Sequence, residues 1–177
     1  NLRDPVGAHR LICGALPRPA GRYLFRTDET STHLVMLVQS TDKPDWSRIK
    51  FAPGFDVQTK TFEPPTEGKF VFRLRANPTQ YDEHGKRIGI QAPEELASWL
   101  EMKGRKAGFS LVAPPEIRKE GFVRAKKGSN EVCLSSVLFL GMLECRDKAL
   151  FAQAMVEGIG TAKAFGFGLL SIARAQA

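Results

Sequence analysis

The stretch "IRKEGFVRAKKGSNEVCLSSVLFLGMLEC", residues 117–145, predicts two long strands joined by a tight turn. The tripeptide "GSN", residues 128–130, is a hairpin turn signal between two runs of strand-forming residues. A helix over residues 147–158 follows directly, because Asp147 can cap its start and Gly158 can end it. The segments on either side of this hairpin and helix then decide which fold they belong to.

Those neighbours complete a known supersecondary order. Residues 69–77 alternate like a strand, residues 92–109 have apolar positions at helical spacing, and residues 167–173 form an apolar last strand. The order strand, helix, strand, strand, helix, strand is that of the ferredoxin-like split βαβ unit.

The first half of the chain repeats this order without the opening strand. Its predicted elements are a helix over residues 4–17, strands over 22–26 and 33–39, a weak helical turn over 43–50 and a strand over 55–63. The segment "PPTEG", residues 64–68, breaks the chain. We predict an α+β protein with two tandem ferredoxin-like domains, residues 1–66 and 67–177. We expect the missing strand to precede Asn1.

The composition is that of a globular protein. The chain has 177 residues, of which 42% are hydrophobic and 25% are charged. No apolar run approaches the roughly 20 residues that a membrane-spanning helix needs, and the polar opening "NLRDPVGAHR", residues 1–10, leads us to expect no signal peptide. The three cysteines, Cys13, Cys133 and Cys145, form no CxxC pair and indicate no disulfide framework. These features predict a reduced, cytoplasmic protein without a membrane partner.

The charge favours a polyanionic partner. The formal net charge is +7 and the pI is near 9.5, which suits nucleic acid but also an ordinary basic protein. The basic residues are clustered: residues 69–87 carry five against two acidic ones, and residues 103–127 carry eight against two. Positive charge concentrated on the 117–145 hairpin repels itself unless an anion lies there.

The strand over residues 69–75 carries its charge on one face. Period-two alternation places Phe70, Phe72 and Leu74 on an apolar face, with Arg73 and Arg75 on the opposite one. The cationic face suits phosphate contact, although a solvated outer face gives the same pattern. The RNP1 signature is absent, so base stacking on sheet aromatics is not indicated.

His9 is the candidate for proton transfer. It lies at the edge of the apolar stripe of the first predicted helix, and its unperturbed pKa of about 6.5 suits acid–base work near neutrality. A histidine at such an edge is more often structural. Cys13 lies one turn on, so a Cys/His pair is an alternative. The three histidines, His9, His33 and His84, share no metal-ligand spacing, so we expect neither metal nor cofactor.

Several motifs together resemble one family. These are "RDPVGAHRLICGALP" (3–17), "PDWSRI" (44–49), "FRLRANPT" (72–79) with "GKR" (85–87), "WLEMKGRKAGF" (99–109) and "GIGTAKAFGFGLLSIA" (158–173). The combination spans nearly the whole chain and is similar to the CasE family, the CRISPR repeat-processing endoribonucleases of type I-E Cascade complexes.

The resemblance implies a function and a set of site residues. It implies metal-independent cleavage of precursor CRISPR RNA at the repeat hairpin by 2′-OH attack, leaving a 2′,3′-cyclic phosphate and a 5′-OH, with His9 as the proton-transfer group. The enzyme would then hold its product beside other Cascade subunits. Charge clustering and the resemblance together give the candidate RNA contacts Arg73, Arg75, Lys86, Arg87, Arg118, Lys119, Arg124, Lys126, Lys127 and Lys163.

One departure from the family leaves the partner of His9 open. Some relatives have a tyrosine three residues before the histidine and a serine further along, where this chain has Val6 and Pro17. Tyr23 follows soon after, but no sequence feature brings its hydroxyl near His9. A non-catalytic subunit that binds the RNA hairpin is therefore an alternative, and a metabolite-binding ferredoxin-like domain is a second one.

The glycines of "GIGTAKAFGFG", residues 158–168, do not form a dinucleotide fingerprint. That fingerprint follows a strand and opens a helix, whereas Gly158, Gly160, Gly166 and Gly168 follow a helix and open a strand. We interpret Gly158 as a helix end and the others as points of tight turning or close approach. A loop packed between the domains and a loop contacting RNA are both compatible with this pattern.

Overall fold

The C-terminal half forms the predicted ferredoxin-like unit. The computed structural model describes residues 2–65, 67–127 and 130–175. Along the C-terminal unit run β3 (Lys69–Ala76), α2 (Pro93–Lys106), β6 (Phe109–Leu111), β7 (Glu116–Lys127), β8 (Asn130–Cys145), α3 (Lys148–Glu157) and β9 (Leu170–Arg174). Within the described residues the antiparallel sheet has the order β6–β8–β3–β9, with β7 also pairing β8. The predicted elements occur in the predicted order, and the short strand β6 between α2 and β7 is an addition that the sequence did not predict.

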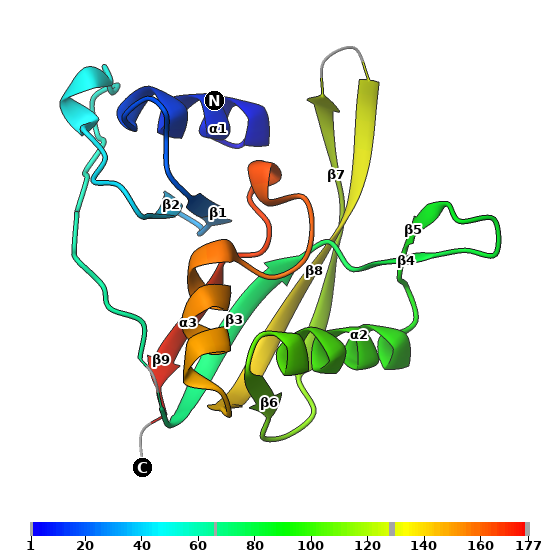
Figure 1. The fold of residues 1–177 in the computed structure, drawn as a ribbon. Coiled ribbons are helices and arrows are strands. Elements are labelled where there is room, and N and C mark those ends of the chain that lie inside the picture. Colours follow the sequence, from blue (N-terminus) through cyan, green and yellow to red (C-terminus); the bar gives the residue numbers. More distant parts are fainter. Residues whose placement is uncertain (1, 66, 128–129, 176–177) are drawn as a thin grey trace.

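Helices α2 and α3 cover one face of this sheet (Figure 1). The apolar residues predicted for the inward face of β3 are buried, Phe70 at 1% exposure and Leu74 at 0%. They pack with Trp99 of α2 and Phe151 of α3 in one core. The alternation of apolar and charged residues along β3 therefore predicted its buried side chains correctly.

Strands β7 and β8 extend beyond the rest of the sheet as a long hairpin (Figure 1). Their pairing runs from Glu116 opposite Leu140 to Lys127 opposite Asn130. The predicted turn residues Gly128 and Ser129 lie outside the described residues. A second, short hairpin of β4 (Thr79–Tyr81) and β5 (Arg87–Gly89) forms an arm that the sequence did not predict.

The N-terminal half contains α1 (Pro5–Ala15), β1 (Tyr23–Glu29), β2 (Leu34–Ser40) and the 3₁₀ turn η1 (Trp46–Arg48). The side chain of Asp4 caps α1 by accepting from the amides of Val6 and Gly7, both at 3.1 Å. The apolar stripe of α1 packs on Phe25 of β1 through Ala8 and Ile12.

The strand predicted over residues 55–63 is wrong. Among the described residues β1 and β2 pair only with each other, and residues 55–63 form neither helix nor strand. Phe55 and Phe62 are 46% and 55% exposed. An alternating segment becomes a strand only when another strand satisfies its backbone groups, and this one has no such partner in the described structure.

A network of charged side chains, here called the Asp28 network, joins the two halves. Asp28 of β1 accepts from Arg26 Nε at 2.9 Å, Arg73 Nη2 at 3.0 Å and Arg75 Nη1 at 3.2 Å. Arg75 also forms a two-pronged pair with Glu120 of β7, at 2.6 Å from Nε to Oε2 and 2.8 Å from Nη2 to Oε1. Arg26 is 5% exposed, so its charge depends on these partners.

Two hydrogen bonds from side chains to backbone carbonyls also join the two halves. Gln39 Nε2 donates to the carbonyl of Met155 at 2.5 Å, and Arg22 Nη2 donates to the carbonyl of Glu157 at 2.6 Å. Both acceptors lie near the end of α3. The two halves of the tandem ferredoxin-like fold are therefore packed against each other, while the domain boundary between residues 66 and 67 stays a prediction. No helix in the described parts of the chain is long and apolar enough to cross a membrane.

The Asp28 network makes folding stability sensitive to acid. Burial opposes ionisation, but the hydrogen bond and charge of Arg26 hold the pKa of Asp28 below its usual value. The pKa of Glu120 is also lowered, where Arg75 outweighs the effect of burial. Carboxyls with lowered folded pKa values stabilise the fold above their unfolded pKa values, near 4, and this stabilisation is lost as pH falls further.

We expect Asp28→Asn to lower the free energy of unfolding at pH 7 by about 1–3 kcal/mol, because hydrogen bonds to charged groups are lost. It should also shrink the drop in melting temperature between pH 7 and a pH well below 4, where the carboxyls of the folded protein become protonated, measured by thermal unfolding. Glu29→Gln, which removes an exposed pair with Arg3 on the same strand, is the control and should change little. Equal acid sensitivity in wild type and Asp28→Asn would contradict the assignment.

Candidate active site

Helix α1 presents His9 and Cys13 on one side. The residues are four apart, so they lie one helical turn from each other, and His9 Nε2 is 3.8 Å from Cys13 Sγ. Both side chains are half-buried. The predicted Cys/His neighbourhood is therefore present, at a separation too long for a strong hydrogen bond.

Tyr23, the first residue of β1, completes this cluster. Its Oη lies 2.6 Å from His9 Nδ1 and 3.1 Å from Cys13 Sγ. The two aromatic rings are tilted by 34° with centroids 5.7 Å apart. The group beside His9 that the sequence left open is thus a tyrosine hydroxyl delivered by β1.

The phenol of Tyr23 stays protonated at neutral pH. Burial, followed by the hydrogen bond to Cys13, raises its pKa well above the usual value of 10.0. A ring nitrogen is a better acceptor than a thiol, and Nδ1 is the nearer atom, so we assign the hydroxyl proton to the bond with Nδ1. Neutral His9 then carries its own proton on Nε2. This pair can pass a proton from Tyr23 to His9 and release one from Nε2.

A sequence signal for Tyr23 existed but was weak. Tyr23 and Phe25 are two residues apart on β1, so they share the sheet face that packs on α1. His9 lies beside Ala8 on the same helix. Alternation and the helical stripe together place Tyr23 near His9, but only once β1 is known to cover α1.

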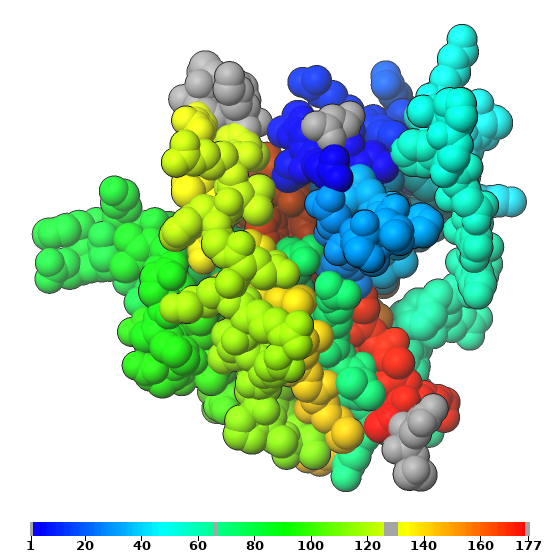
Figure 2. All heavy atoms as spheres, turned by 180° about the vertical axis from the view of Figure 1, so that it is seen from behind, coloured from blue at the N-terminus to red at the C-terminus, as the bar shows by residue number. Residues whose placement is uncertain are grey.

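The hairpin of β7 and β8 rises beside α1 (Figures 1 and 2). Of the predicted RNA contacts on β7, Arg118, Lys119 and Arg124 are exposed. Arg118 pairs with Glu116 at 2.5 Å, and Lys119 Nζ donates to the carbonyl of Gln91 at 3.3 Å.

Lys126 and Lys127, two further predicted RNA contacts, are the last two residues of β7. The backbone of Lys126 and Lys127 pairs with Glu131 and Asn130 at the end of β7, close to the hairpin turn. Their side chains lie outside the described residues, so their role stays a prediction.

Arg73 and Arg75 are not the freely presented cationic face that the sequence predicted. Both belong to the Asp28 network, and Arg75 additionally donates to the carbonyl of Thr27 at 2.8 Å. The fork of Arg75 is occupied by Glu120. The alternating pattern was correct, but the partners of these arginines are carboxylates of the protein itself. We therefore reassign both residues to the junction between the two halves.

Lys86 and Arg87 lie on the arm formed by β4 and β5. The arm projects from the molecule (Figures 1 and 2). The guanidinium of Arg87 stacks over the ring of Tyr81 at 5.4 Å and donates to its hydroxyl at 2.9 Å. Asp82 organises the turn by accepting from the amides of His84 and Lys86. These exposed cations stay predicted RNA contacts.

The glycine-rich loop packs between the two halves. Gly158 ends α3 with φ +77°, and a Cβ there would lie 2.8 Å from Leu24 of β1. Gly168 has φ +86°, and a Cβ there would lie 2.7 Å from a backbone oxygen. Gly160 and Gly166 also have positive φ. Positive φ and close approach thus account for these glycines as parts of a packed loop, and contact of this loop with RNA stays a prediction.

Lys163 lies in the same loop, in the short turn η2 (Lys163–Phe165), which contacts α1. Burial, and then the nearby charge of Arg22, lowers its pKa, while Glu157 acts in the opposite direction. A half-buried ammonium beside a like charge favours a bound anion. Its predicted phosphate contact is consistent with this environment.

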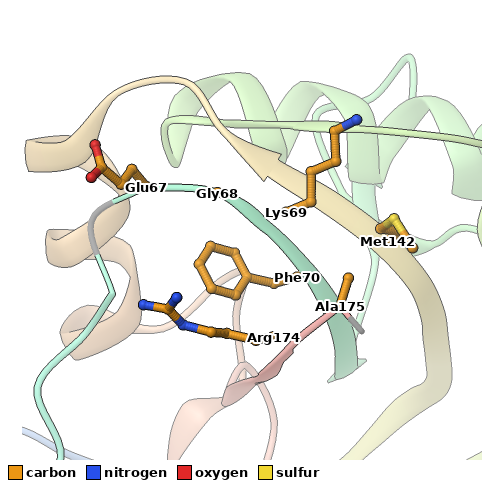
Figure 3. Close-up of a pocket in the computed structure, with 7 residues that line it drawn as sticks. All are labelled: Glu67, Gly68, Lys69, Phe70, Met142, Arg174 and Ala175. Carbon is orange, nitrogen blue, oxygen red and sulfur yellow. The ribbon is translucent and has the colours of Figure 1, made fainter. Parts of the chain in front are cut away.

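A shallow hollow at the far end of the molecule from α1 is lined by none of the predicted site residues. It has a volume of about 470 Å³ and is lined by Glu67, Gly68, Lys69, Phe70, Met142, Arg174 and Ala175. Figure 3 shows Lys69 and Glu67 on different sides of it. The carboxylate of Glu67 is paired with Lys148 at 2.9 Å. Across residues 2–65, 67–127 and 130–175, no group of three His, Cys, Asp or Glu side chains is arranged to hold a metal ion.

Comparison with known proteins agrees with the motifs. Residues 1–174 match the family described as CRISPR associated protein. The chain is also 32% identical to the CRISPR-associated endoribonuclease Cse3 of Thermus thermophilus, over 98% of this chain and 92% of the relative. The chain belongs to the CasE/Cse3 family of CRISPR-associated proteins. The resemblance noted in the sequence is confirmed.

A second relative and two solved structures are also similar to this chain. The Cascade subunit CasE of Escherichia coli is 29% identical over 89% of this chain and 84% of that protein. A structure of the endoribonuclease Cse3 bound to a 19-nucleotide RNA has a TM-score of 0.87 at 30% identity, covering 97% of this chain and 91% of the other. A structure of Thermus thermophilus Cse3 with an RNA representing a pre-cleavage complex has a TM-score of 0.78 at 28% identity, covering 97% and 90%.

The Tyr23–His9 contact predicts the protonation pattern of the histidine. In ¹⁵N NMR spectra of the neutral ring, His9 should show the Nε2–H tautomer, because Nδ1 accepts from Tyr23. In Tyr23→Phe this preference should weaken. His84, whose side chain is 82% exposed, serves as an internal reference. Identical His9 ring shifts in both proteins would contradict the assigned bond.

Proposed function

We propose that this protein is an endoribonuclease that cuts precursor CRISPR RNA at the repeat hairpin and stays bound to the product as a Cascade subunit. The observation that carries the proposal is the Tyr23–His9 pair, at 2.6 Å, on a half-exposed surface beside the basic hairpin. The relatives support it, since they include a named endoribonuclease and a named Cascade subunit.

The proposed reaction needs no metal ion. The 2′-oxygen upstream of the scissile phosphate attacks phosphorus, the P–O5′ bond breaks, and the products are a 2′,3′-cyclic phosphate and a 5′-OH. The 2′-OH proton passes to Tyr23 as the tyrosine hydroxyl proton passes to His9 Nδ1. His9 then gives its Nε2 proton to the departing 5′-oxygen. Protons balance, and the phenol never has to persist as an anion.

A cation is needed where charge develops on the phosphate. Lys163, in the turn that contacts α1, is the residue proposed for this role. Charged donors aimed at the developing oxyanion commonly supply a large part of such catalysis. Arg22, which lowers the pKa of Lys163, adds to the positive potential there.

The hairpin of β7 and β8 is the proposed RNA-binding element. An A-form duplex has a deep, narrow major groove, so a basic β-hairpin recognises mostly phosphates and shape. Arg118, Lys119 and Arg124 lie along β7, and the backbone of Lys126 and Lys127 continues to its end. Such a grip explains how the product stays bound after the cut.

We expect the protein to cleave its cognate repeat RNA in EDTA, with His9→Ala and Tyr23→Phe each lowering the single-turnover rate by about 10²–10⁴-fold, as expected for loss of a positioned acid or base. Product ends are identified by phosphatase sensitivity and mass spectrometry. His33→Ala, which removes an exposed histidine, is the control. Full activity of His9→Ala would refute its role, and no cleavage by wild type would favour the non-catalytic alternative.

The double variant Lys126→Ala with Lys127→Ala should weaken hairpin binding. It should also lower the slope of log affinity against log salt by about one unit per lysine, as phosphate neutralisation requires. Filter binding across a salt series measures both quantities. Lys50→Ala with Lys60→Ala removes two exposed charges elsewhere and should leave the slope nearly unchanged. Equal slopes for both double variants would mean that the hairpin tip does not contact phosphates.

A further inference from the structure

Strand β7 contains a bulge at Glu120. Lys119 lies opposite Val137 and Gly121 lies opposite Ser136, so Glu120 is an extra residue with no partner on β8. Gly121 has φ +92°, a conformation that residues with a Cβ rarely adopt. Bulges of this kind redirect a side chain out of the regular alternation.

The bulge directs Glu120 into the junction between the two halves. Its Oε2 accepts from Arg75 Nε at 2.6 Å and from Ser136 Oγ at 2.8 Å, and its Oε1 accepts from Arg75 Nη2 at 2.8 Å. The guanidinium of Arg75 then reaches β1, where it donates to the carbonyl of Thr27 and to Asp28. A continuous chain of charge-assisted bonds therefore runs from the hairpin to β1.

The two ends of this chain carry the two parts of the site. Asp28 and Tyr23 lie on the same strand, five residues and about 17 Å apart. Glu120 and Lys127 lie on the other strand, seven residues and about 23 Å apart. Strands transmit position well because their backbones are fixed by pairing. The pairing of Glu120 with Arg75 thus sets where the hairpin stands relative to the Tyr23–His9 pair.

We propose that Glu120, Arg75 and Asp28 are positioning residues that hold the RNA-gripping hairpin in register with the His9–Tyr23 pair. The proposal rests on the proposed function. It assigns these residues to the placement of the scissile phosphate and not to RNA affinity, since their charges are paired with one another. Cleavage needs the reacting atoms within a narrow range of distance and angle, so a small shift of the hairpin slows the reaction without releasing the RNA.

The arrangement demands arginine at position 75. Only a planar guanidinium can fork onto Glu120 and still reach Thr27 and Asp28 on another strand. Lysine at this position keeps the charge but offers a single point of contact. Arg75→Lys therefore separates the geometry of the network from its charge.

The test measures single-turnover cleavage at saturating protein, RNA affinity, and the position of the cut by sequencing the product ends. We expect Glu120→Gln and Arg75→Lys to lower the cleavage rate by about 10–100-fold, with a broadened cut position and unchanged affinity. Glu116→Gln is the matched control, because it removes an equal charge from the same strand, and the one ion pair that Glu116 forms among the described residues is with exposed Arg118. It should cleave as wild type does.

The outcomes separate the two proposals. Wild-type cleavage with unchanged rate and cut position in Glu120→Gln and Arg75→Lys would overturn the positioning role alone. Loss of rate only in proportion to loss of affinity, or an equal loss in Glu116→Gln, would overturn it as well, since charge or folding would then be the cause. Absence of wild-type cleavage would overturn the proposed function and the positioning role with it.

Discussion

The junction between the two halves depends on one carboxylate, that of Asp28, which accepts from three guanidinium groups. Arg26 is almost fully buried, and a buried guanidinium without an anionic partner is strongly destabilising. The backbone at Asp28 must therefore lie where all three groups can reach it. Because Asp28 belongs to β1, this requirement also fixes the strand that carries Tyr23, and with it the surroundings of His9.

The elements that were predictable carry their own local signals. Helix α1 has a capping aspartate, an apolar stripe and a proline beyond its end, while β3 alternates and buries its apolar face. The short strands β4, β5 and β6 have three residues each, too few for a period to show. The segment over residues 55–63 has the opposite problem: it alternates, but strand formation depends on a partner that its own sequence does not specify.

The candidate site likewise contains residues that the sequence could identify and residues that it could not. His9 could be selected from residue type and place on a helix, since both are local properties. Tyr23 could not, because its bond to His9 depends on how β1 packs over α1. Arg73 and Arg75 have the same local pattern as a phosphate-binding strand. Their actual partners, Asp28 and Glu120, lie some 45 residues away in either direction, where no period or spacing can identify them.

This outcome changes how the basic charge of the chain is interpreted. A cluster of basic residues in the sequence shows only how much positive charge is present. RNA binds the positive charge that carboxylates of the folded protein leave unpaired. In the segment over residues 69–87, two arginines are paired with carboxylates, whereas Lys86 and Arg87 stay exposed. On β7, Arg124 remains exposed, whereas the carboxylate of Glu120 at the bulge is bonded to Arg75 and Ser136. The same bulge that connects the two halves therefore also pairs the negative charge of Glu120 with Arg75, so that this charge opposes RNA binding by β7 less than an unpaired carboxylate would.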